Sequence, residues 1–234
     1  LAFYELYRDK NLEKIHLTPS PLSLLRRGVG ERSNVLDQWI LARLDELIKL
    51  STKNLDNYKL LEPTRAMRDF IGDLSTWYLR RSRERIKEGD QDAKKTLYFV
   101  LKTLAKLLAP FAPFTAEDIW LKLKNENDLE SVHLTEWPKI SKNLFNIFSR
   151  EEPIILNNIK VVREVVSLGL KERQEAGLAV RQPLASLKWK MESEKLPSEY
   201  LDLIKDELNV KEVVFDVSLE KEFELDIKIT PELK

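Results

Sequence analysis

Arginine side chains gather in one short stretch of this sequence, directly after two aromatic residues. The stretch covers residues 73–90 and reads DLSTWYLRRSRERIKEGD. Its cations are Arg80, Arg81, Arg83, Arg85 and Lys87. Because residues three and four apart are neighbours on a helix, these cations would form two adjacent stripes whose repulsion a polyanion would relieve. Guanidinium groups bind phosphate, and an outward-facing Trp77 or Tyr78 ring would stack on an unpaired base. The stretch therefore predicts an RNA contact.

The same residues also have a purely structural explanation. Trp77 and Tyr78 continue the apolar spacing that begins at Phe70, so we expect both rings in the core and not on the surface. Arginines close to a helix C-terminus also interact favourably with the helix dipole. Residue chemistry alone leaves RNA binding and a solvated helix as open alternatives.

A second set of polar side chains lies in the segment RQEAGLAVRQP, residues 173–183. Arg173, Arg181 and Gln182 flank a glycine turn between an expected helix and an expected strand, and they form a second candidate RNA contact. The alternative is that Arg181 and Gln182 only bind loop carbonyls, because buried C=O groups need donors.

Residues that support catalysis or metal binding are scarce. The chain has no cysteine, six glycines and two histidines, which excludes a disulfide framework and a thiolate zinc site. His16 and His133 lie far apart, and the sequence has no GxxxxGK[ST] loop, dinucleotide-binding turn or Ser–His–Asp set. Glu117 and Asp118 are adjacent carboxylates, but Thr115 and Asp118 have the spacing of a helix cap, which explains them without acid–base catalysis. We expect no catalytic residue and no metal ligand.

The chain is electrically balanced. Of its 234 residues, 39 are basic and 39 acidic, so any affinity for nucleic acid must come from local clustering. No apolar run approaches about 18 residues, and the start, LAFYELYRDKNLEK, lacks the features of a signal peptide. We therefore expect a soluble, cytoplasmic protein. The sequence opens in mid-pattern without a methionine, as an excised piece of a longer protein would.

Apolar residues at three- and four-residue spacing predict four helices with short connections. They run from Leu36 through Ile48, from Pro63 to Gly89, from a cap at Asp90 through Leu108, and from Thr115 through Leu123. A further helical pattern covers residues 151–176. Beyond it, alternating residues predict strands at 186–191, 211–217 and 222–229, with one helix at 198–208.

These elements predict a mainly α fold, in which an antiparallel helical bundle is followed by a small α+β domain. We assign residues 1–32 to a connecting segment and 33–140 to the bundle. Residues 141–180 form a long linking helix region that completes the bundle, and residues 181–234 form the α+β domain.

Several longer segments, taken in order, resemble one known family. They are NVLDQWILARL, FIGDLSTWYLRRSRER, LLAPFAPFTAEDIW and VHLTEWP, followed by GLAVRQPLASLKW and DELNVKEVVF. They resemble the anticodon-binding helical domain, and the small mixed domain behind it, of class I aminoacyl-tRNA synthetases for branched aliphatic amino acids. The resemblance covers about residues 33–216. WYLRRSR is most similar to the isoleucyl enzymes, with the valyl and leucyl enzymes as the alternative.

The resemblance implies a bundle that presents a positive surface to the anticodon stem of an isoleucine tRNA and reads its unpaired anticodon bases. The implied RNA contacts are Arg80, Arg81, Arg83 and Arg85, with Arg173, Arg181 and Gln182 as a second patch. We expect a monomer that binds tRNA and has no membrane or DNA partner.

The resemblance also implies a parent enzyme that joins isoleucine to its tRNA with ATP and magnesium. This chain lacks the HIGH and KMSKS signatures and any editing insertion, so we expect its catalytic site elsewhere in the parent and no cofactor here. The cysteine-bound zinc of some family members is also absent, since the chain has no cysteine.

A hypothesis of a different class remains. A helical protein-interaction module could use the same arginine row to meet an acidic partner protein. Competing tRNA would abolish binding only if RNA is the partner.

Overall fold

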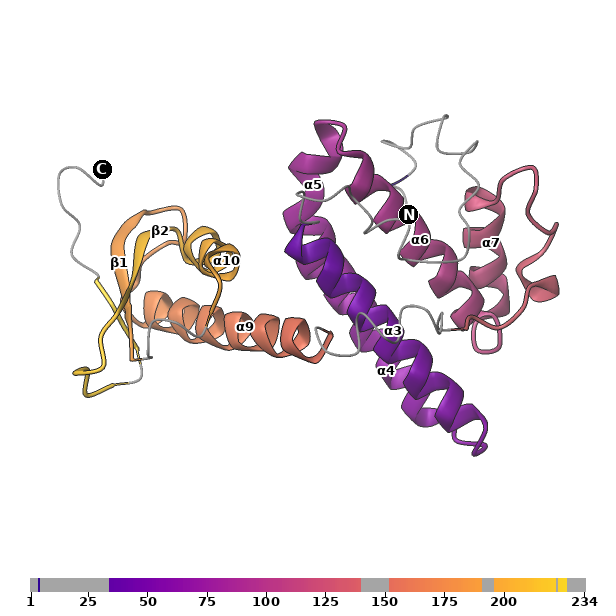
Figure 1. The fold of residues 1–234 in the computed structure, drawn as a ribbon, viewed down its shortest axis with the longest axis horizontal. Helices are drawn as coiled ribbons and strands as arrows, with labels where there is room; N and C mark the ends of the chain where they lie inside the picture. The colour runs from indigo at the N-terminus through magenta and orange to yellow at the C-terminus, as the bar shows by residue number, and fades with distance from the viewer. Residues whose placement is uncertain (1–3, 5–33, 140–151, 191–195, 222, 227–234) are drawn as a thin grey trace. The chain divides into compact units, whose positions relative to one another are not determined.

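The structure of this chain is a computed structural model that describes residue 4 and residues 34–139, 152–190, 196–221 and 223–226. It falls into two compact units, Leu1–Pro153 and Ile154–Lys234. The first unit is helical and the second contains a small sheet, so the expected mainly α fold followed by an α+β part is confirmed (Figure 1). Apart from Tyr4, the connecting segment expected over residues 1–32 lies outside the described residues.

Helices with buried apolar stripes build the first unit. They are α3 (Val35–Leu55), α4 (Leu61–Gly72), the π-helix η2 (Asp73–Leu79), α5 (Arg80–Lys87), α6 (Gln91–Leu108), α7 (Pro113–Leu123) and the 3₁₀ turn η3 (Val132–Leu134). α3 packs against α4 and α6, and α6 packs against α7 (Figure 1). The predicted stripe of α3 is confirmed, because Leu36, Trp39, Ile40, Leu44, Leu47 and Ile48 are all buried.

The turn between α5 and α6 has the chemistry that the sequence predicts. Gly89 takes φ +97°, a left-handed conformation that glycine adopts without steric cost, and it ends the helix. Asp90 then caps α6, because its Oδ1 accepts hydrogen bonds from the backbone N–H groups of Asp92 (2.9 Å) and Ala93 (3.1 Å). Both predicted boundaries are confirmed.

The second predicted helix differs from the prediction in its winding. It begins at Leu61, two residues before Pro63, and between α4 and α5 it passes through the π-helix η2 without a break. The hydroxyl of Ser75 donates to the Ile71 carbonyl and that of Thr76 to the Gly72 carbonyl, each at 2.7 Å. Such side-chain donors supply partners for carbonyls that lose their regular helical ones, and periodicity in the sequence does not detect them.

The start predicted for the fourth helix at Thr115 is wrong. α7 begins at Pro113, where the missing N–H of proline is tolerated because the first helical N–H groups have no helical partner. Glu117 does not serve the helix start either. Its Oε2 accepts hydrogen bonds from the Ser131 hydroxyl and the Val132 backbone N–H, both at 2.9 Å, so the carboxylate ties the 131–134 turn to α7.

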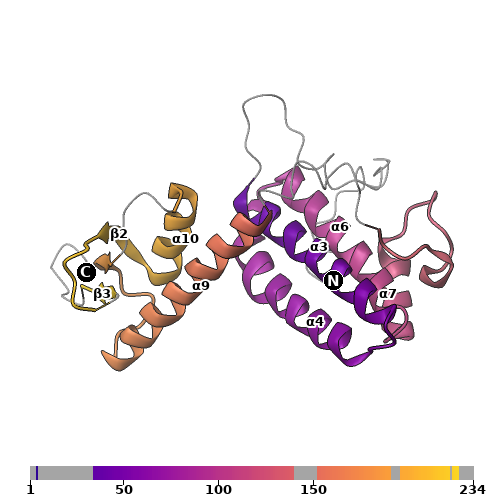
Figure 2. The same cartoon turned by 60° about the horizontal axis from the view of Figure 1, so that its bottom comes forward.

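The second unit is a small three-stranded sheet with two helices (Figure 2). Its elements are α9 (Glu152–Glu175), β1 (Leu184–Trp189), α10 (Ser198–Leu208), β2 (Val210–Phe215) and β3 (Phe223–Leu225). The strand order is β2-β1-β3, with β1 parallel to β2 and antiparallel to β3. Because a parallel pair needs a crossover, α10 lies between β1 and β2 in the chain. The bounds predicted for this helix match those of α10, and residues 227–229 of the third predicted strand lie outside the described residues.

Two contacts of the helix α9 lie within the second unit. Glu172 Oε2 accepts a hydrogen bond from the backbone N–H of Leu225 at 3.2 Å. Gly169 lies against Leu208, and a Cβ atom at this glycine would stand 2.6 Å from the Leu208 Cδ1 atom. The absence of a side chain at Gly169 thus lets α9 and α10 approach closely.

We expect Gly169→Val to lower the free energy of unfolding of the second unit by about 1–3 kcal/mol, because the added methyl groups overlap the buried Leu208. The matched control is Gly72→Ala, where no atom lies within 4 Å of the added methyl. It should instead stabilise its helix by about 0.5–1 kcal/mol. Urea unfolding followed by circular dichroism would measure both, and equal effects of the two variants would contradict the close approach.

Candidate nucleic-acid interface

A buried ion network lies beneath the arginine row and joins α3, α5 and α6. The Arg85 guanidinium donates to Asp37 through Nη2–Oδ2 at 2.7 Å and Nη1–Oδ1 at 3.3 Å, and its Nε donates to Asp90 Oδ2 at 3.0 Å. The Tyr78 hydroxyl donates to Asp37 Oδ1 at 2.8 Å. Asp37 is 2% exposed and Tyr78 is fully buried. We call Asp37, Tyr78, Arg85 and Asp90 the Asp37 network.

The two carboxylates of the network differ in their environment. Burial raises the pKa of Asp37, although the bonds from Arg85 and Tyr78 oppose this shift. Burial also acts to raise the pKa of Asp90, but the Ala93 N–H and the Arg85 guanidinium outweigh it and hold that pKa below its usual value. Burial beside the Asp37 carboxylate raises the pKa of Tyr78 well above its ordinary value, so this phenol stays a hydrogen-bond donor.

One of the predicted RNA contacts, Arg85, is part of the Asp37 network. Arg85 is committed to two carboxylates inside the protein, so its charge is already compensated. The expectation that Tyr78 lies in the core is confirmed, whereas Trp77 is half-buried.

The outer side of α5 carries the exposed arginines. Arg80 and Arg83 are exposed, while Arg81 is half-buried. Arg80 Nε donates to the carbonyl of Thr76 at 2.9 Å, which holds this edge of its guanidinium group against the π-helix. Arg80 and Arg83 are three residues apart on a helix and are therefore neighbours on one face.

One residue of the second predicted patch, Arg173, is buried inside the second unit. Arg173 is 1% exposed, so a tRNA phosphate cannot reach it in this conformation. Its Nη1 donates to the carbonyls of Ala179 (3.1 Å) and Gln182 (3.0 Å), and its Nη2 donates to those of Leu208 and Asn209. These carbonyls belong to a loop and to the end of α10, where helical partners are lacking. Of the three predicted residues, Arg181 is exposed and Gln182 is half-buried.

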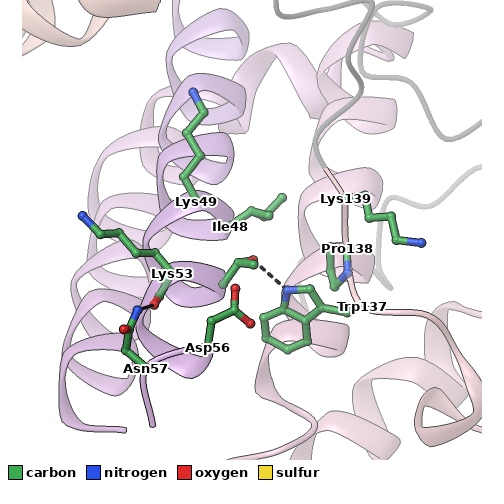
Figure 3. Close-up of a pocket in the computed structure, with 9 residues that line it drawn as sticks. Ile48, Lys49, Lys53, Asp56, Asn57, Trp137, Pro138 and Lys139 are labelled. Atoms are coloured by element: carbon green, nitrogen blue, oxygen red, sulfur yellow. Dashed lines mark hydrogen bonds between the residues drawn. The ribbon is translucent and has the colours of Figure 1, made fainter. Parts of the chain in front are cut away.

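Another surface of the first unit was not predicted from the sequence. A cleft of about 610 Å³ lies between the last turns of α3 and the segment after η3 (Figure 3). It is lined by Ile48, Lys49, Thr52, Lys53, Asp56, Asn57, Trp137, Pro138 and Lys139. In the sequence, the aromatic Tyr58 within the polar turn KNLDNYK could have indicated a binding surface here. The sequence does not reveal that Trp137 lies next to this turn.

Two further kinds of feature are absent from the described residues. Within them, no group of three or more histidine or acidic side chains is placed to hold a metal ion. In the same part of the chain, no helix combines the length and apolar character needed to cross a membrane.

Comparison with known proteins identifies a family for this architecture. A family model described as the anticodon-binding domain of tRNA ligase matches residues 37–188. Isoleucine–tRNA ligase of Clostridium kluyveri is 37% identical over 97% of this chain and 21% of its own length. The enzyme of the same name from Dehalococcoides mccartyi strain CBDB1 is 41% identical over 76% of this chain and 18% of its own length. That from Chlamydia muridarum is 38% identical over 92% of this chain and 20% of its own length. The chain thus spans about a fifth of these relatives.

We expect Asp37→Ala to lower the free energy of unfolding of the first unit by about 3–5 kcal/mol, because it leaves the half-buried Arg85 and the Tyr78 hydroxyl without their central acceptor. The control is Asp118→Ala, which removes an exposed ion pair with Lys122 and should change stability by less than about 1 kcal/mol. Denaturant unfolding measures both, and a similar small change in each would show that the network contributes little.

The depressed pKa of Asp90 leads to a pH-dependent stability. Asn at this position keeps a capping oxygen but not the charge that pairs with Arg85, so the unaltered chain should be more stable than Asp90→Asn at neutral pH. The difference should persist above the ordinary pKa of 3.8 and disappear as the pH falls through the lower pKa of the folded state. Unfolding free energies of both chains between pH 7 and pH 2 measure it, and a constant difference would contradict the Asp90–Arg85 pairing.

Proposed function

Since the chain belongs to the family of tRNA ligases with this anticodon-binding domain, we propose that its helical bundle binds the anticodon arm of an isoleucine tRNA. The names of its relatives support isoleucine as the amino acid. The parent protein is then a ligase that attaches isoleucine to its tRNA with ATP. This chain supplies tRNA recognition and not catalysis. We further propose that the ligase acts as a monomer in the cytoplasm, where its tRNA is charged.

The paired exposure of Arg80 and Arg83 on α5 is the observation that carries the proposal. The chain has no net charge, so its attraction for RNA must come from a local surface such as this one. The Asp37 network fixes α5 from below, which presents the two guanidinium groups on a rigid helix. Phosphate contacts of this kind orient an RNA and do not depend on its sequence.

The roles of the remaining predicted contacts follow from their burial. Arg81 supplies a half-buried contact from the neighbouring stripe of α5, which it shares with Arg85. In the second unit, the exposed Arg181 and the half-buried Gln182 form a weaker contact. Arg85 and Arg173 act indirectly, because both are occupied within the fold.

We expect Arg80→Ala/Arg83→Ala to weaken binding of an isoleucine tRNA transcript and of the same transcript with a replaced anticodon to the same extent. The slope of log affinity against log salt should become shallower by about 0.7–0.9 for each phosphate contact removed. Filter binding at several salt concentrations measures both quantities. Lys122→Ala is the control, since this exposed cation lies on α7, where it pairs with Asp118, and its loss should leave the slope unchanged.

Three results would count against the proposal. The first is that the unaltered chain fails to bind tRNA at every salt concentration tested. The second is that the double variant keeps the full slope of log affinity against log salt. The third is that an acidic protein competes for the arginine surface while tRNA does not. The last result would favour a protein-interaction module.

A further inference from the structure

The turn between α3 and α4 contains an aromatic residue in an unfavourable backbone conformation. Tyr58 takes φ +58°, in the left-handed region that side chains with a Cβ atom rarely adopt. The residue is 95% exposed, so packing does not compensate for this conformation. A bulky residue in this region points to a function outside the fold.

Other helix ends of the chain show what folding alone favours at this position. The N–H of Tyr58 donates to Leu55 and that of Lys59 to Asn54, both at 2.9 Å. The ends of α5 and α9 have the same pair of bonds, but Gly89 and Gly177 fill the left-handed position there. A glycine would suit the α3 end equally well, so the tyrosine is present for its side chain.

The cleft beside this turn is suited to a flat, polar ring. The Trp137 indole N–H donates to the Thr52 hydroxyl at 2.9 Å, which fixes the ring against α3 (Figure 3). Figure 3 shows the Asp56 carboxylate beside this ring, where it can accept from a base amino or imino group. Ile48 and Pro138 complete an apolar lining.

The surroundings of the cleft are basic. Lys49 and Lys53 point outward from α3 at the rim (Figure 3), and Lys59 follows Tyr58 in the turn. Lys139, on the opposite side, forms an exposed pair with Glu136. This charge is complementary to a phosphate backbone, while the aromatic rings suit nucleobases.

From these features we propose that the cleft and Tyr58 bind unpaired nucleotides of an RNA loop. One base lies on Trp137 with its amino or imino group toward Asp56, a neighbouring base stacks on Tyr58, and the rim lysines contact the phosphates. The proposal rests on the proposed function, because it identifies the surface that contacts the loop of the same tRNA.

The two proposed contact surfaces lie at opposite ends of one continuous helical segment. α4, η2 and α5 run without a break over residues 61–87, which corresponds to about 40 Å. The helix α5 therefore lies at the opposite end of the α3–α4 pair from the turn that connects α3 to α4 (Figure 1). A tRNA arm would place its paired phosphates on α5 and its loop at the turn.

Tyr58→Gly tests this assignment, because glycine suits the left-handed backbone and the variant should fold. We expect its affinity for an isoleucine tRNA transcript to fall about 5- to 140-fold, the equivalent of one lost stacking contact. For the same transcript with abasic nucleotides at the anticodon, affinity should not change. Tyr58→Phe should bind like the unaltered chain because it keeps the ring. Phe114→Ala, which removes a ring that is 90% exposed on α7, is the matched control.

The outcomes separate this inference from the proposed function. If Tyr58→Gly binds the intact transcript as tightly as the unaltered chain, or loses affinity equally for the abasic one, the loop assignment is overturned. If tRNA binding still depends on Arg80 and Arg83 in that case, the proposed function remains supported. If the unaltered chain binds neither transcript, both are overturned. A melting temperature for each variant confirms that it is folded.

Discussion

The pairing of Arg85 with Asp37 is the interaction on which the arginine face of the bundle depends. Asp37 lies in the first turn of α3 and Arg85 near the end of α5, so their contact closes a long segment of chain. Asp90 accepts a hydrogen bond from the Nε edge of the same guanidinium group and also caps α6. A buried ion pair contributes little net stability when compared with an apolar pair, but it is costly to break and admits few alternative geometries. It thus fixes the angular position of α5 relative to α3 and α6.

Arginine side chains in this chain either hold the fold together or lie at its surface. Which of the two applies depends on whether carboxylates or backbone carbonyls surround the guanidinium group. Arg85 and Arg173 connect segments that are distant in sequence, one through carboxylates and the other through backbone carbonyls. Arg80 and Arg83 remain at the surface. The planar guanidinium suits all these roles, because its donors can meet two acceptors at once, whether these belong to a carboxylate, a peptide or a phosphate.

The sequence predicts those parts of the fold that depend on local chemistry. The apolar stripe of α3, the cap at Asp90, the stop at Gly89 and the bounds of α10 each depend on residues within a few positions. Features set by distant partners were not predictable. Burial of Arg173 depends on carbonyls about 35 residues away, and the cleft depends on Trp137 reaching Thr52. For the same reason, the sequence identified the arginine row but did not show that Arg85 is bound inside the fold while Arg80 and Arg83 are exposed.

The π-helix between α4 and α5 has a consequence for comparing this chain with its relatives. A turn of π-helix contains more residues than a turn of α-helix. One extra residue rotates the following helix about its axis by roughly 100°, so the side chains of α5 point in a different direction than they would if α4 continued as a regular α-helix. A relative with identical arginines but an unbroken α-helix would direct them elsewhere. Aligning the two sequences without a gap would then equate a surface arginine in one protein with an inward-facing arginine in the other. The winding of seven residues, Asp73–Leu79, therefore decides which positions are equivalent in space.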